Sequence, residues 1–181
     1  MKYISKSIVI AVFMLPLLGF SQKAFEKFEN SDKIGSVTIN KAMMGIVASM
    51  SADEKNKEAQ DFIELAKSID NINVFVSEDA GASAEMNATA KKYIKKASLE
   101  SLMKVKDDDS HVDFYVKSGK DDDHVSELLM MVTGMDEKAK GSNIETVLVT
   151  MTGDIDLTKV GSLVNKMNLP KDLKKANKKS E

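Results

Sequence analysis

The spacing of apolar residues changes repeatedly along this chain. Segments with helical spacing predict helices, and segments in which apolar and polar residues alternate predict strands. Helical spacing is clearest after Ser51 and Glu54, which have the spacing of a capping box. The ranges predicted to be helical are 24–31, 51–69, 83–97 and 156–167, with 42–50 as a short apolar piece compatible with helix. Each of these ranges places its apolar residues on one face, which we expect to pack against a sheet.

Alternation predicts six strands, over residues 35–40, 71–77, 99–106, 111–117, 124–133 and 144–152. In the second of these, Ile72, Val74 and Val76 occupy every other position. Two strand–helix–strand crossovers lead into three strands at hairpin spacing. We therefore expect an α+β fold: a two-layer sandwich with a mixed, mostly antiparallel sheet of about six strands and helices on one face.

The first 21 residues have the order of a secretory signal peptide. Lys2 and Lys6 precede an apolar run of 13 residues, 8–20, and Ser21 ends a zone of small residues. The run is too short to span a bilayer, which needs about 20 apolar residues. We expect cleavage before Gln22 and export to the periplasm or out of the cell, with a retained membrane anchor as the alternative.

The exported chain is predicted to be one α+β domain, 22–170, followed by a Lys-rich tail, 171–181, that we expect to be disordered. The formal net charge of the whole chain is −2. Loss of Lys2 and Lys6 leaves 24 lysines against 28 acidic residues, a charge of −4. This mildly acidic balance favours solubility and gives little attraction to anionic surfaces, so a nucleic-acid partner is not expected.

Three residue types are absent, and their absence removes several function classes. The chain has no Cys, which excludes disulfides, thiol nucleophiles, Cys-ligated metals and a lipidated N-terminal Cys. All 26 basic residues are Lys, so no guanidinium group can clamp a phosphate or carboxylate through two parallel hydrogen bonds. With no Trp and three Tyr, stacking sites for sugars or bases have few rings to use.

Two segments carry a resemblance to a known family. Residues 37–43, Val-Thr-Ile-Asn-Lys-Ala-Met, and residues 152–157, Thr-Gly-Asp-Ile-Asp-Leu, resemble an exported Bacteroidota family known as domain of unknown function 4252. The Phe-Ser-Gln at 20–22 is also similar to signal-peptide ends of that phylum. The resemblance implies a location in the cell envelope and gene neighbours that encode extracytoplasmic sigma-factor systems. It supplies no catalytic or ligand-binding residue.

Two similar acidic segments are the most conspicuous local motif. They contain Asp107, Asp108 and Asp109 followed by His111, and Asp121, Asp122 and Asp123 followed by His124. Carboxylates beside a His are ligands for a divalent cation. If 111–117 is one strand, however, the two runs lie at its opposite ends, roughly 20 Å apart, and cannot share a metal. We interpret them as solvated turns, and weak calcium binding by either run remains an alternative.

Two other motifs resemble chemical sites. Ser101 and Lys104 have the Ser-x-x-Lys spacing of penicillin-recognising enzymes, but that chemistry needs a helical turn, and on a strand we expect these two side chains to face opposite sides. Methionine is enriched, with ten residues after position 21, including Met43 and Met44. We interpret these methionines as core filling, with an adaptable Met-lined surface for a partner as the alternative.

The sequence therefore assigns no catalytic, cofactor-binding or metal-binding residue and no cofactor. We predict that the protein is not an enzyme but a protein-binding or regulatory module whose partner is another envelope protein. An exposed apolar patch at Leu128, Met130 or Phe114 would support that prediction. The alternative is a carrier of a small apolar ligand in a cavity lined by Met and Phe. A hydrolase would require His111 or His124 beside a Ser or Asp in a cleft.

Overall fold

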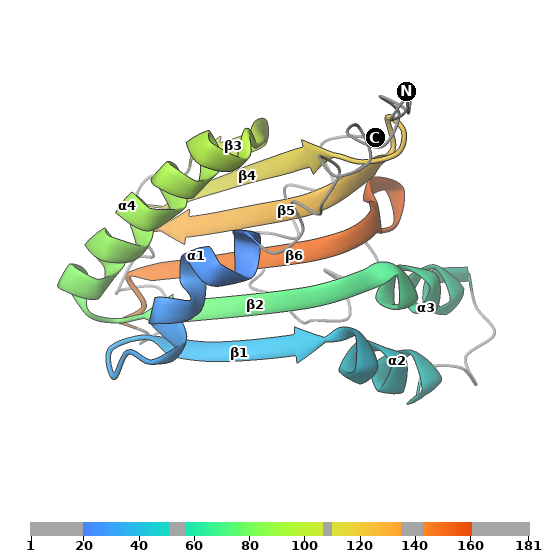
Figure 1. Cartoon of the computed structure of the whole chain (residues 1–181), viewed down its shortest axis with the longest axis horizontal. Helices are drawn as coiled ribbons and strands as arrows, with labels where there is room; N and C mark the ends of the chain where they lie inside the picture. The colour runs from blue at the N-terminus through green and yellow to red at the C-terminus, as the bar shows by residue number, and fades with distance from the viewer. Residues whose placement is uncertain (1–19, 51–56, 107–109, 135–142, 161–181) are drawn as a thin grey trace, which may run out of the picture.

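The computed structural model describes residues 20–50, 57–106, 110–134 and 143–160 (Figure 1). The elements along the chain are α1 (Phe20–Glu29), β1 (Gly35–Asn40), α2 (Lys41–Met50), α3 (Lys57–Ser68), β2 (Ile69–Ser77), α4 (Ala80–Ala97), β3 (Glu100–Lys106), β4 (His111–Ser118), β5 (His124–Thr133), β6 (Thr146–Asp156) and the 3-10 turn η2 (Leu157–Lys159). None of the helices in this described part is long and apolar enough to cross a membrane.

The six strands form one open sheet in the order β1-β2-β6-β5-β4-β3, and every neighbouring pair is antiparallel. The predicted α+β sandwich with a six-stranded sheet is confirmed, and so is the meander of β3, β4 and β5. The first two crossovers differ from the prediction because they produce no parallel pair. The chain leaves β1 into α2 and α3, which both lie at one end of the sheet, and re-enters from that same end, so β2 runs back along β1 (Figure 1).

Helices α1 and α4 cover one side of the sheet, which we call the helix face (Figure 1). Its core is rich in aromatic side chains: Phe25 and Phe28 from α1, Phe75 from β2 and Tyr93 from α4. The rings of Phe25 and Tyr93 meet edge to face with centroids 5.0 Å apart. Burying each such side chain stabilises the fold by about 1.5–3 kcal/mol, so these contacts fix both helices on the sheet.

The opposite side of the sheet carries a second core, because consecutive residues of a strand point to opposite faces. In β5, Leu129 packs into the helix-face core while Leu128 and Met130 pack into the second core. Helices α2 and α3 also contribute to the second core, through Met44 and Phe62. Burial on both faces explains why β5 is apolar at consecutive positions rather than alternating.

Strand β6 extends to Asp156, beyond the end predicted for it. The extension pairs Gly153 with Ile69, and a bulge lies next to this pair between Ile69 and Asn71 of β2. Asp156 then accepts a hydrogen bond from the backbone N–H of Thr158, at 2.9 Å, and so caps η2. The start of a helical segment predicted at Asp156 is therefore a 3-10 turn, and the remainder of that segment, like the predicted tail and residues 1–19, lies outside the described residues.

Candidate functional site

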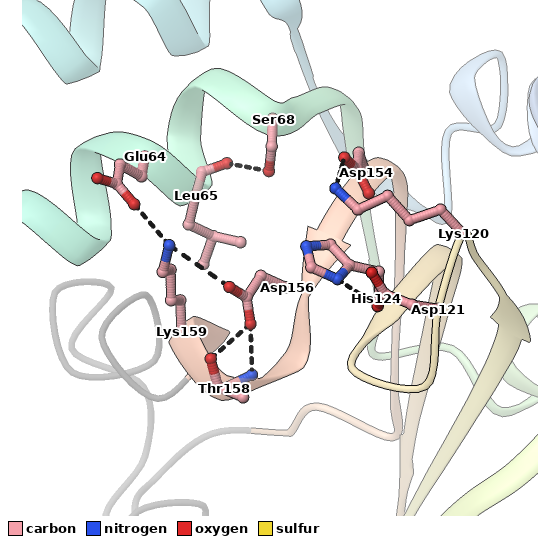
Figure 2. A network of polar contacts seen from close by, with 10 residues as sticks. All are labelled: Glu64, Leu65, Ser68, Lys120, Asp121, His124, Asp154, Asp156, Thr158 and Lys159. Carbon is pink, nitrogen blue, oxygen red and sulfur yellow. Dashed lines mark hydrogen bonds and ion pairs between the residues drawn. The ribbon is translucent and has the colours of Figure 1, made fainter.

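The second acidic run forms the exposed turn between β4 and β5, as predicted (Figure 2). His124 Nδ1 lies 2.6 Å from Asp121 Oδ1, and the backbone N–H of Asp123 donates to the same oxygen at 3.2 Å. The contact with His124 lowers the pKa of the Asp121 carboxyl. Asp121 therefore stabilises its own turn. The first run, 107–109, lies outside the described residues.

Ion pairs connect this turn to β6, and η2 to α3 (Figure 2). Lys120 Nζ lies 2.7 Å from Asp154 Oδ2 on β6, and Lys159 Nζ lies 2.5 Å from Glu64 Oε2 on α3 and 3.4 Å from Asp156 Oδ2. The pair of Lys120 and Asp154, whose side chains are both more than half exposed, contributes little to stability. Among the described residues, no group of three His, Asp or Glu side chains is placed to hold a metal ion. The described contacts at this end of the fold connect the β4–β5 turn, β6, η2 and α3.

The Ser-x-x-Lys segment lies on edge strand β3, but one part of the prediction for it is wrong. A bulge between Ser101 and Met103 shifts the register, so that Ser101 lies opposite Tyr115 and Lys104 lies opposite Asp113. Those two partners are two residues apart on β4 and share a face, so Ser101 and Lys104 also share a face rather than facing opposite sides. Lys104 Nζ lies 6.0 Å from the Tyr115 ring centroid, in a cation–π contact on the surface.

The apolar patch expected on the sheet is not where we predicted it. Leu128 and Met130 are buried in the second core, and Phe114 is half-buried against it. The prediction is wrong for these residues because it assigns all the helices to one face, whereas both faces of β5 are covered.

Helix α2 instead presents an apolar stripe to solvent. Met43, Ile46 and Met50 are 52%, 57% and 81% exposed, although Met44 on the same helix is only 3% exposed. The three exposed side chains have the spacing i, i+3, i+7 and therefore lie along one side of the helix. The sequence predicts an apolar segment compatible with helix over residues 42–50, but it does not show which methionine of this segment faces the core.

A pocket of about 670 Å³ opens on the helix face between α1, α4, β4 and β5. The residues that line it are Lys23, Ala24, Tyr93, Lys96, Ala97, Ser98, Lys117 and Glu127. This lining, within the described part of the chain, contains neither Met nor Phe. The pocket is therefore unlike the Met- and Phe-lined cavity expected of an apolar-ligand carrier.

Two of these lining residues are buried and bonded to each other. Tyr93 and Glu127 are each 6% exposed, and Tyr93 Oη donates a hydrogen bond to Glu127 Oε2 at 2.9 Å. The helix predicted over residues 83–97 contains Tyr93, whereas no pattern discussed above singles out Glu127. The signal that could have found it is a lone carboxylate directly before the apolar run of β5, where a buried charge requires a partner.

Polar side chains continue from the pocket across the sheet. Lys117 lies opposite Glu127, Glu127 opposite Thr152, and Thr152 opposite Asn71. Asn71 is buried, and its Nδ2 donates to Asn73 Oδ1 at 3.4 Å, while its Oδ1 has no hydrogen-bond partner in the described part of the chain. A row of neighbouring residues across the helix face, from β4 to β2, is therefore polar, in contrast to the aromatic core beside it.

Comparison with known proteins places the chain in a family. Residues 28–163 match the model of a family described as Domain of unknown function (DUF4252). No curated protein and no solved structure matches the chain. The matched region includes every strand of the sheet and both segments, 37–43 and 152–157, that carry the sequence resemblance. Because the match covers most of its length, the chain belongs to the family of domain of unknown function 4252.

Proposed function

We propose that this protein is an exported cell-envelope protein, periplasmic or secreted, that acts without catalysis by binding another protein. The observation that carries the proposal is the exposed stripe of Met43, Ile46 and Met50 on α2. Apolar anchors at i, i+3 and i+7 are the pattern by which a helix enters a groove on a partner. Exposed apolar side chains that lie together in this way are typical of a site where another molecule binds.

Edge strand β1, next to α2, supports the same proposal. The strand has the sequence Gly-Ser-Val-Thr-Ile-Asn, with no charged residue, and Val37 is more than half exposed. The other edge, β3, carries Glu100, Lys104 and Lys106, which hinder pairing with a further strand. The unprotected edge and the apolar stripe are adjacent in the chain, so we propose that a partner contacts both.

The proposed location depends on the N-terminal sequence. A basic start, a short apolar run and small residues before Gln22 favour recognition by the export machinery. A binding function in the envelope also agrees with the lack of any Cys or Arg for thiol or phosphate chemistry.

In-cell photocrosslinking tests the proposal. A photoreactive amino acid replaces Ile46 in one version of the protein and Lys92, on the exposed side of α4, in another. We expect a discrete crosslinked species from position 46 that is absent from position 92 and is lost when Met43→Lys and Met50→Lys are added. Identical products from both positions, or none from position 46, would refute the proposal.

A further inference from the structure

We propose that the pocket between α1 and α4 binds an amphiphilic anion, a small molecule with one acidic group and an apolar chain. This goes beyond the proposed protein-binding function, which uses α2 and β1 instead. The pocket volume of about 670 Å³ is within the range of roughly 300–1,000 Å³ typical of small-molecule sites.

Charge around the pocket favours an anion. Among the described residues that line it, Lys23 and Lys117 bring amines from α1 and β4, and Glu127 is the carboxylate, hydrogen-bonded by Tyr93. Helix α4 beside the pocket adds further exposed lysines, Lys91, Lys92 and Lys95. Lysines gathered at a concave surface raise the local concentration of anions.

Each lysine of the pocket lining comes from a different element, so the fold brings the charges together. Lys23 is on the first turns of α1, Lys96 is in the last turn of α4, and Lys117 is near the end of β4. Lys117 lies directly opposite Glu127 in the ladder between β4 and β5. Glu127 in turn is fixed by its hydrogen bond from Tyr93. Lys23 and Lys96 are exposed, whereas the bonded pair of Tyr93 and Glu127 is buried.

The remaining lining suits an apolar chain. Ala24 and Ala97 offer methyl groups from the two helices, and the buried ring of Tyr93 packs edge to face on Phe25. Ser98, also in the lining, has φ of 56°, a left-handed conformation that Gly normally adopts at a helix end.

Calorimetry with the full chain tests the proposal, with dodecanoate as the anion and dodecyltrimethylammonium as a cation of equal chain length, both below their micellar concentrations. We expect dodecanoate to bind at one site and the cation not to bind. The double variant Lys23→Gln, Lys117→Gln should weaken dodecanoate binding about tenfold, because charge-assisted contacts are lost. The control Lys91→Gln, Lys92→Gln removes two exposed lysines of α4 outside the pocket and should leave affinity unchanged.

Methyl NMR keeps the proposal falsifiable if a variant is unstable. Dodecanoate should shift the methyl signals of Ala24 and Ala97 and leave that of Ala48, in the second core, unchanged. Binding of the cation with equal affinity, equal weakening in both lysine double variants, or no dodecanoate binding would overturn the proposal. Dodecyl phosphate then identifies the source of the ligand: tighter binding than dodecanoate supports a lipid phosphate, and weaker binding supports a fatty acid.

Discussion

Tyr93 Oη donates a hydrogen bond to Glu127 Oε2 at 2.9 Å and thereby links α4 to β5 inside the helix-face core. Tyr93→Phe removes the donor from a buried carboxyl group, so we expect the free energy of unfolding to fall by about 1–3 kcal/mol, measured by urea denaturation. Tyr115→Phe, on a half-buried ring of β4, should cost less than about 0.5 kcal/mol. Equal losses in the two variants would show that the hydrogen bond does not stabilise the fold.

Gly153 should be intolerant of any side chain. Its φ is +148°, and a Cβ there would lie 2.9 Å from Ile69 Cα on β2. We expect Gly153→Ala to destabilise the protein by about 2–3 kcal/mol, since strain and close backbone contact act together. Gly45, in α2, has nothing within 4 Å of the position that a Cβ would occupy, so Gly45→Ala should instead stabilise by about 0.5–1 kcal/mol. Thermal melts of both variants give the comparison, and a stable Gly153→Ala would contradict the argument.

The strand that contains Gly153 also shows which parts of the fold can be predicted from the sequence and which cannot. The pattern predicts a strand over residues 124–133 with the observed bounds, because an apolar run flanked by polar turns is a local signal. The pair Gly153 and Asp154 instead indicates the end of a strand, because Gly and Asp normally interrupt one. Only the approach of β2 at its bulge, a contact between segments far apart in the chain, explains why β6 continues through a Gly.

The contribution of Asp156 to the free energy of unfolding should depend on pH. Its pKa is lowered, first by the hydrogen bond from the Thr158 hydroxyl and then by the backbone N–H of Thr158 and by Lys159. A lowered folded-state pKa means that the stabilisation is fully present above the unfolded value, near about pH 4, and is lost as pH falls through the folded value. Urea midpoints should therefore be lower for Asp156→Asn than for the wild type at pH 7, and the difference should narrow as the pH falls below about 4. A difference that stays the same size at every pH below about 4 would contradict this assignment.

Met43 and Met44 are adjacent in sequence and opposite in environment. Met43 is 52% exposed and Met44 is 3% exposed. Met44→Lys places a charge in the second core, so we expect it to cost at least the roughly 2–5 kcal/mol of truncating a buried Met. Met43→Lys should change stability by less than about 0.5 kcal/mol. Chemical denaturation compares the two variants, and similar losses would show that the α2 stripe is not free in solution.

The candidate site is far less predictable than the fold. Lys23, Lys96, Lys117 and Glu127 belong to four separate elements, and no motif joins them in the sequence. Lys96 lies within the predicted helix 83–97 and is exposed. Its place in a pocket depends on where α1 crosses the sheet. The acidic runs are conspicuous because they are contiguous, yet Asp121 serves only its own turn in the described structure.

Export should leave α1 almost whole. The helix begins at Phe20, so cleavage before Gln22 removes only its first two residues and retains Phe25 and Phe28, each 1% exposed in the helix-face core. We expect the intact mass of the protein from its own envelope to correspond to a chain that begins at Gln22. A chain truncated to begin at Asn30 loses both phenylalanines, which at about 3–5 kcal/mol each is comparable to the total stability of a domain, so it should not fold. Circular dichroism distinguishes the two chains. A folded chain beginning at Asn30 would show that α1 is dispensable, and a mature protein that retains Met1 would refute the export prediction.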